Sequence, residues 1–170
     1  MYLIAAALKM EIKALTKDLE NRTDHTWADF SFWHGFLYGE EVVLAVTGVG
    51  KCLTAVILQH LIEIYKPQGL FFIGLAGALT QRFEIGDIVV AQSCTQWDMD
   101  ASRFGFKRGE VPYSPQYSRL KPHPELYAKG ISYVPSQGAL YSWNLISGDT
   151  FFTRRNEAKT GEIIKDLQAD

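Results

Sequence analysis

The sequence predicts an α/β fold with a largely parallel sheet. Three observations lead to this prediction: continuous apolar runs of strand length, intervening segments whose apolar residues recur at helical spacing, and a glycine-rich turn, "TGVGK" at 47–51, between a strand-like and a helix-like segment. Apolar strands that alternate with helices are typical of proteins built from strand–helix–strand units. A chain of 170 residues with 47% hydrophobic residues is long enough for one compact domain with a substantial core.

The first 65 residues contain strands and helices in alternation. The continuous apolar run 2–8 predicts a strand buried on both faces, and the apolar residues of 10–21 have the spacing of a short amphipathic helix. Segment 30–48 divides into two strands at a turn near Gly39. A helix over 51–65 follows and is ended by "KPQG".

The second part of the chain is less regular. Segment 70–79 predicts another buried strand that runs into a Gly/Ala-rich turn, and 84–93 predicts a strand entered through Gly-Asp. Segment 94–126 is rich in proline and is expected to be mostly irregular, although it is too aromatic for a linker. A strand over 138–149 and an exposed helix over 154–168 complete the prediction.

Three loops follow predicted strands and should meet at one edge of the sheet. They are the loops around Lys9–Glu11, Gly48–Lys51 and Gly74–Ala78. Sites in parallel sheets form at the carboxyl ends of the strands. The site is therefore expected where these three loops converge.

Composition limits the classes of partner and compartment. A net charge of -2 without a Lys/Arg cluster predicts no nucleic-acid binding. Cys52 and Cys94 lie far apart outside any CxxC motif, which predicts buried, reduced thiols. No stretch approaches a membrane span, and the N-terminal apolar run meets Lys9 and Glu11 too early for a secretory signal. We therefore expect a cytoplasmic protein that does not associate with a membrane.

The turn "TGVGK" suggests phosphate binding, but the flanking residues oppose this interpretation. A P-loop needs Ser or Thr after its lysine to ligate Mg²⁺, whereas Cys52 follows Lys51 and Ala45 stands where the first glycine belongs. The dinucleotide fingerprint fails too, because Leu53 takes the place of its third glycine. The remaining interpretation is a tight strand-to-helix turn.

Five segments carry a resemblance to a known family: "AALKMEIKAL", "TGVGKCLTA", "IGLAGALTQRFEIGDIVVA", "QWDMDASRFGFKRGEVP" and "LISGDTFF". Together they resemble the methylthioadenosine/S-adenosylhomocysteine nucleosidases of the purine nucleoside phosphorylase and hydrolase superfamily, in order and over nearly the whole chain. The resemblance implies a three-layer α/β/α fold with a central mixed sheet over a single domain, 1–170. It also implies a homodimer and a small-molecule purine nucleoside substrate, whose N-glycosidic bond is hydrolysed without a cofactor to release adenine.

The resemblance assigns the water-activating role to Glu11, in the loop after the first strand. A carboxylate there would repel phosphate, which favours a hydrolase over a phosphorylase. The structural alternative is a solvated acid in a first helical turn, stabilised by the helix dipole.

The resemblance also implies a set of substrate-binding residues. Phe151 would stack on adenine and the backbone of Phe152 would hydrogen-bond the ring edge. By the same resemblance, Leu8 and Val49 line the pocket for the 5′-alkylthio group, and Ala101, Phe104 and Pro112 reach that pocket from the partner subunit. Ala76 and Gly77 complete the set of substrate-binding residues. An apolar pocket suits a 5′-thioether. Ordinary core packing is the alternative for all these apolar side chains.

Two further features of the sequence bear on what the resemblance implies: a DxD pair and the point at which the chain ends. Asp98 and Asp100 form a DxD pair, but no further ligand cluster supports a metal, so none is expected. The chain ends at Asp170, where the family continues with a Met-Glu pair that grips the ribose and an aspartate that protonates the purine. We therefore expect an incomplete domain, its closing elements missing, with little or no activity of its own. It could be a fragment of an active enzyme or an inactive purine-binding dimer; a related phosphorylase or a futalosine-type hydrolase are the alternative activities.

Overall fold

A computed structural model describes residues 1–151 together with 161, 163 and 167. The chain divides into two compact units, residues 1–76 and 77–170, which we describe separately. The prediction of a single domain remains a prediction. In the described part of the chain, no helix has the length and apolar character needed to cross a bilayer.

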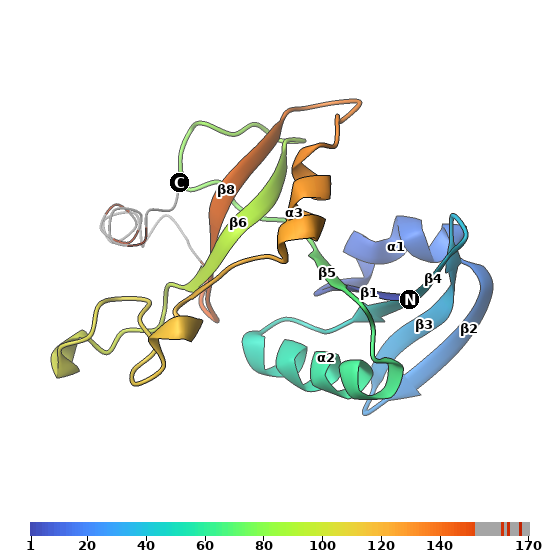
Figure 1. Cartoon of the computed structure of the whole chain (residues 1–170), viewed down its shortest axis with the longest axis horizontal. Helices are drawn as coiled ribbons and strands as arrows, with labels where there is room; N and C mark the ends of the chain where they lie inside the picture. Colours follow the sequence, from blue (N-terminus) through green and yellow to red (C-terminus); the bar gives the residue numbers. More distant parts are fainter. Residues whose placement is uncertain (152–160, 162, 164–166, 168–170) are drawn as a thin grey trace. The chain divides into compact units, whose positions relative to one another are not determined.

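The first unit is a five-stranded mixed sheet with two helices (Figure 1). The strand order is β2-β3-β4-β1-β5, with β1 parallel to both β4 and β5 and with β3 antiparallel to both β2 and β4. The elements, in chain order, are β1 (Tyr2–Ala6), α1 (Lys9–Asp18), β2 (Glu20–Trp27), β3 (Phe30–Leu37), β4 (Glu40–Val46), α2 (Lys51–Tyr65) and β5 (Leu70–Ile73).

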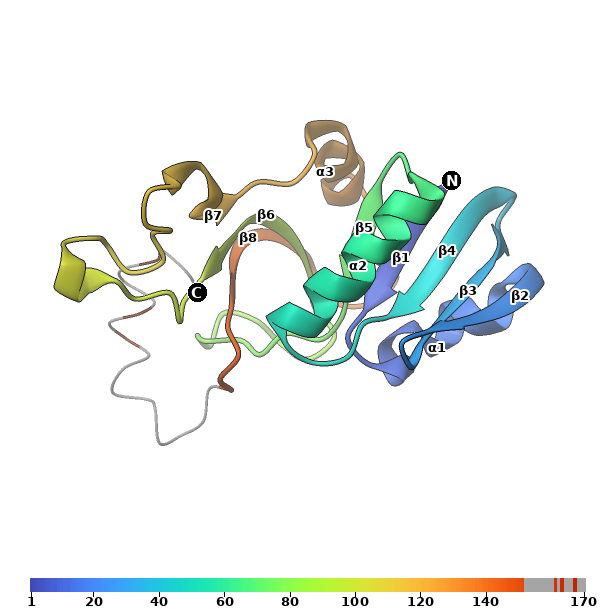
Figure 2. The ribbon, with the colours of Figure 1, turned by 90° about the horizontal axis from the view of Figure 1, so that it is seen from below.

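The two helices cover opposite faces of this sheet, as Figures 1 and 2 show. Ile12 of α1 is fully buried in a cluster that includes Leu44 and Trp33 of the sheet. Ile57 and Leu61 of α2 are fully buried against the opposite side chains of β1, β3 and β4. Because successive strand residues point to opposite faces, both faces need apolar residues, which explains the continuous apolar runs of β1 and β4. This unit has the predicted three-layer α/β/α arrangement with a mixed sheet.

Three predictions for the first unit need correction. Strand β2 was not predicted, because "ENRTDHTW" is polar and almost wholly exposed at the sheet edge. The strand predicted over 70–79 is shorter, and β5 is an edge strand whose Phe71 and Phe72 are exposed rather than buried. Cys52 is also exposed, since it begins the outer face of α2, whereas Cys94 is partly buried. Burial raises the pKa of the Cys94 thiol.

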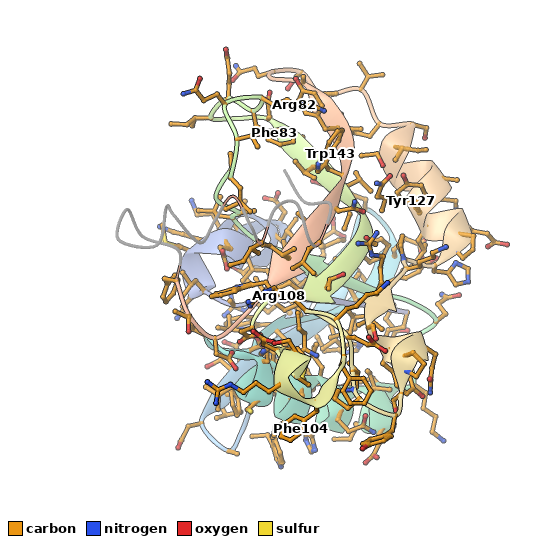
Figure 3. All side chains as sticks on the ribbon, turned by 90° about the vertical axis from the view of Figure 1, so that its left-hand side faces the viewer. Arg82, Phe83, Phe104, Arg108, Tyr127 and Trp143 are labelled. Atoms are coloured by element: carbon orange, nitrogen blue, oxygen red, sulfur yellow. The ribbon has the colours of Figure 1, made fainter. Side chains whose placement is uncertain are left out.

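The second unit is built on a three-stranded sheet with the order β7-β6-β8, in which β6 and β8 are parallel. Its elements, in chain order, are β6 (Ile88–Gln96), two 3₁₀ turns (Ser102–Phe104 and Pro115–Tyr117), β7 (Arg119–Leu120), α3 (Pro124–Ile131) and β8 (Leu140–Ser147). Figure 3 shows Arg82, Phe83 and Trp143 gathered at one end of this unit. The Arg82 guanidinium lies 4.4 Å from the Trp143 ring centroid, and Phe83 meets that ring edge-on.

The predicted strands 84–93 and 138–149 exist with shifted or shorter bounds. Segment 94–126 is mostly irregular, as expected, but α3 was not predicted. This helix starts at Pro124, because proline at the first helical position needs no amide hydrogen. The helix predicted over 154–168 and Phe152 fall outside the described residues, apart from the isolated positions 161, 163 and 167.

Candidate active site

The carboxyl ends of three parallel strands lie together in the first unit. The last residue of β1, Ala6, is in register with Val46 at the end of β4 and with Ile73 at the end of β5. The loops that follow these strands therefore start from one edge of the sheet, namely the edge formed by the carboxyl ends of β1, β4 and β5, as predicted from the sequence. They bring Glu11 and the glycine-rich segments of 47–50 and 74–76 to that edge.

Glu11 is held by the backbone of two of these loops. It occupies the third position of α1 and is half-buried. The Leu8 N–H donates to Oε2 over 2.8 Å, and the Leu75 N–H donates to Oε1 over 3.0 Å. A carboxylate can accept about four hydrogen bonds, so acceptor capacity remains on both oxygens. The carboxylate is thus fixed in place while it stays able to accept a proton or a further hydrogen bond.

Gly74 leaves room for this carboxylate. A Cβ at position 74 would lie 3.1 Å from Glu11 Oε1, closer than ordinary van der Waals contact. The close approach of the β5 loop to Glu11 therefore depends on glycine at this position. Next to it, the Leu75 and Ala76 side chains are exposed, and Gly77 belongs to the second unit.

The turn between β4 and α2 is fixed by glycines and by a buried hydroxyl. Gly48 and Gly50 have positive φ angles of 75° and 108°, which favour glycine. Thr47 is fully buried, and its Oγ1 lies 3.1 Å from Thr54 Oγ1, which ties the turn to α2. Val49 stands between the glycines with 52% of its surface exposed. The segment is a tight strand-to-helix turn that presents Val49 at the same sheet edge as Glu11.

In the second unit, the segment after β8 is anchored to the end of β6. The Trp97 N–H donates to the Ser147 carbonyl over 3.0 Å, and the Asp149 N–H donates to Asp98 Oδ2 over 2.9 Å. Gly148 lies so close to the Trp97 indole that a Cβ there would be 2.3 Å from Nε1. Asp98 therefore positions backbone of the segment that the resemblance assigns to purine binding. Phe151, at its end, is 77% exposed.

The loop that follows β6 is braced internally by Asp100. Its Oδ2 pairs with the Arg108 guanidinium at 2.9 Å, and its Oδ1 accepts the Ser102 N–H at 3.1 Å. The hydrogen bonds from Ser102, with the nearby Arg108 charge, hold the pKa of Asp100 below its usual value. Figure 3 labels the Phe104 and Arg108 side chains of this loop. Phe104 is 83% exposed, while Ala101 and Pro112 are partly buried.

The geometry therefore brings some of the predicted residues together. Leu8, Val49 and Ala76 lie in the three loops at one edge of the first unit, and Glu11 lies in the first turn of α1 at the same edge. Gly77, Ala101, Phe104, Pro112 and Phe151 belong to the second unit. Among the described residues, no group of three or more His, Cys, Asp or Glu side chains is arranged to hold a metal. It was not predicted from the sequence that the Leu8 and Leu75 N–H groups donate to Glu11. The Leu8 donor could have been predicted, because a glutamate at the third position of a helix is part of the capping-box pattern.

Comparison with known proteins relates the chain to one superfamily over nearly its whole length. The phosphorylase superfamily matches residues 2–170. The 5′-methylthioadenosine/S-adenosylhomocysteine nucleosidase of Chromohalobacter salexigens is 35% identical over 120 residues, which are 71% of this chain and 51% of that protein. The nucleosidase of Shewanella piezotolerans is 30% identical over 92% of this chain and 68% of its own length. The chain thus spans about half to two thirds of the length of the curated relatives it matches.

A solved structure agrees with the sequence comparisons. The Neisseria meningitidis nucleosidase in complex with methylthio-immucillin-A superposes with a TM-score of 0.87 at 27% identity. The match covers 98% of this chain and 72% of that chain. The chain belongs to the phosphorylase superfamily and, within it, to the family of the 5′-methylthioadenosine/S-adenosylhomocysteine nucleosidases.

Proposed function

We propose that the protein that carries this chain hydrolyses the N-glycosidic bond of 5′-methylthioadenosine and S-adenosylhomocysteine and releases adenine. The observation that carries the proposal is the Glu11 carboxylate, held by the Leu8 and Leu75 amides at the edge where three strands end. The nucleosidase relatives and the bound nucleoside analogue in the Neisseria structure support the same substrate class.

Glu11 is proposed as the general base. The bond between the anomeric carbon and the purine nitrogen breaks and leaves its electron pair on the purine, which takes up a proton from a general acid and departs as neutral adenine. The ribose takes on oxocarbenium character, and a water adds its oxygen to the anomeric carbon while Glu11 accepts the water proton. The two backbone hydrogen bonds fix the plane of the carboxylate. Glu11 can therefore accept a hydrogen bond from the attacking water without a change in its side-chain conformation. A positioned base of this kind typically contributes about 10²–10⁴-fold to the rate.

The same charge favours hydrolysis over phosphorolysis. Inorganic phosphate at the anomeric carbon would bring a second anion to the Glu11 carboxylate, and like charges at contact distance repel. Water carries no such penalty. The nucleophile is therefore proposed to be water, in contrast to the phosphorylases that give the superfamily its name.

Adenine release in phosphate-free buffer tests this proposal. The protein is expected to convert 5′-methylthioadenosine and water into adenine and 5-methylthioribose, at a rate that added phosphate does not raise. Chromatography of both products measures this rate. Release that needs phosphate and yields the sugar 1-phosphate would identify a phosphorylase instead. Adenine binding without any release would identify a non-catalytic purine-binding protein.

A homodimer is proposed around the loop that holds Phe104. This loop is braced by the Asp100–Arg108 ion pair and by the Gly109 N–H, which donates to the Met99 carbonyl over 2.7 Å. A strongly exposed aromatic side chain on a braced loop has the character of an interface anchor. Phe104→Ser should shift the protein from dimer to monomer in analytical ultracentrifugation, whereas Tyr133→Ser, an exposed aromatic site on another loop, should not. A dimer unaffected by the Phe104 change would contradict this interface.

The proposed setting is the cytoplasm, in methionine salvage. The two free cysteines, Cys52 and Cys94, suit a reducing compartment. Cell fractionation tests the location: recovery of the protein outside the cytoplasmic fraction would overturn it.

A further inference from the structure

A pocket of about 270 Å³ opens in the first unit beside the candidate active site. Its walls come from the start of α1, from the hairpin turn between β2 and β3, and from the end of β4: Lys9, Asp29, Phe30, Ser31, Trp33, Val46 and Gly48. Because β3 runs antiparallel to β4, the start of β3 lies at the edge where β4 ends. The pocket therefore lies at the same sheet edge as Glu11.

Two lining residues are chain neighbours of predicted nucleoside-binding residues. Gly48 precedes Val49, and Lys9 follows Leu8; both Val49 and Leu8 are predicted to contact the 5′-alkylthio group. A 5′-substituent longer than a methyl group, continuing past these two side chains, would meet this pocket. S-adenosylhomocysteine carries such a substituent, whereas 5′-methylthioadenosine does not.

The pocket offers one positive and one negative side chain. Within the described part of the chain, neither Lys9 nor Asp29 has an ion-pair partner, and the two do not pair with each other. Lys9 is also the first residue of α1, where the helix dipole adds to its attraction for an anion. A simple anion would be repelled by Asp29 and a simple cation by Lys9. A zwitterion presents both charges and fits both side chains.

The turn that carries Asp29 has an unusual backbone. Ala28 and Asp29 have positive φ angles of 46° and 67°, the pattern of a type I′ hairpin turn, which usually contains glycine or asparagine. Aspartate tolerates this conformation, but alanine is strained in it. Strained backbone is concentrated at functional sites. Here the strained turn places a carboxylate on the wall of the pocket.

The other walls suit an aliphatic chain. Phe30 and Val46 are partly exposed, and Trp33 is almost fully buried. Methylene groups can pack on such a surface. This packing stabilises the complex in proportion to the apolar area that is removed from water. A homocysteine tail has methylene groups next to its sulfur and an amino-acid zwitterion at its end, so it can use both the apolar walls and the two charged side chains.

We propose that Lys9 and Asp29 form a subsite for the amino-acid end of S-adenosylhomocysteine, with Lys9 binding its carboxylate and Asp29 its ammonium group. This inference rests on the proposed function. It makes the two residues determinants of specificity, because they favour S-adenosylhomocysteine over 5′-methylthioadenosine.

The test compares the two nucleosides in charge-removed variants. We expect the ratio of kcat/KM for S-adenosylhomocysteine to that for 5′-methylthioadenosine to fall about two- to fivefold in Lys9→Met and in Asp29→Asn, the contribution of an exposed charge pair. The double variant should lower the ratio about tenfold. Asparagine keeps the positive φ of position 29 accessible, so Asp29→Asn removes charge without changing the turn. Lys13→Met and Asp18→Asn, exposed charges elsewhere on α1, serve as matched controls and should leave the ratio unchanged.

A third ligand separates a binding role from a structural one. An analogue of S-adenosylhomocysteine that keeps the carboxylate but lacks the amino group should be bound more tightly by Asp29→Asn than by the unmodified protein, because the variant no longer repels its lone anion. Isothermal calorimetry measures this reversal, which loss of folding would not produce. An unchanged ratio in the double variant, with both nucleosides still hydrolysed, would overturn the subsite and leave the proposed function intact. If the unmodified protein neither bound nor hydrolysed either nucleoside, the proposed function would fail and the subsite with it.

Discussion

Replacing Glu11 with glutamine is expected to lower kcat for adenine release by about 10²–10⁴-fold, the usual contribution of a positioned acid–base group. Glutamine has nearly the same shape but cannot accept the proton of the attacking water. Its amide nitrogen also cannot accept a hydrogen bond, so either the Leu8 or the Leu75 N–H loses its acceptor. KM should change far less than kcat, because Glu11 acts on water rather than on the purine. Steady-state kinetics with 5′-methylthioadenosine measure both constants.

Two further variants sharpen this test. Glu40→Gln removes an exposed carboxylate at the start of β4, the opposite end of that strand from the site, and should leave kcat unchanged. Gly74→Ala keeps the carboxylate but places a methyl group 3.1 Å from its Oε1, so the base must shift by a few tenths of an ångström. We expect an intermediate loss, about tenfold, since misplacement by about 1 Å can cost about 10²-fold. A Glu11→Gln protein that hydrolyses nucleoside at the original rate would exclude Glu11 as the base.

The parts of the fold that were predictable from the sequence are those where local pattern and tertiary environment agree. Helix α2 has the predicted bounds, because a glycine turn precedes it and "KPQG" ends it. The central strands β1 and β4 are buried on both faces, so continuous apolar runs identify them. Strand β2 was missed because an edge strand with exposed side chains carries no such pattern; its pairing with β3 defines it. Helix α3 was missed because its eight residues begin in a proline-rich segment.

The location of the candidate site was predictable from the sequence, but the hydrogen-bond partners of its residues were less so. The topology of parallel strands puts the three loops at one edge, and this follows from element order alone. The hydrogen bond from Leu75 to Glu11 joins residues 64 positions apart, and it depends on the pairing of β1 with β5. Asp98 is a second example of a partner that the sequence does not reveal. A DxD pair suggests a metal site, whereas in the structure the Asp98 carboxylate accepts a hydrogen bond from the backbone N–H of Asp149. Chemistry-bearing residues stand out in a sequence, but their partners depend on the tertiary fold.

The second large effect is expected in the core that holds α1 on the sheet. Leu44 of β4 is fully buried in the cluster that contains Ile12 of α1. Leu44→Ala removes the buried side chain and leaves a cavity, which should lower the free energy of unfolding by about 2–5 kcal/mol. The urea midpoint should fall with little change in the slope of the transition, because the surface exposed on unfolding hardly changes. Chemical unfolding followed by tryptophan fluorescence measures both.

The Leu44 variant also tests the support of the catalytic residue, because Glu11 reaches the site only if α1 is packed on this face of the sheet. Leu44→Ile keeps the volume and should cost less than about 1.5 kcal/mol, and Leu120→Ala, at an exposed position of β7, less than about 0.5 kcal/mol. Hydrogen exchange should speed up in residues 9–18 of Leu44→Ala before it does so in α2, which packs on the other face. Equal acceleration in both helices, or a cost of Leu44→Ala as small as that of Leu120→Ala, would contradict the packing of α1 on Leu44. In that case the position of Glu11 would need another source of support than this core.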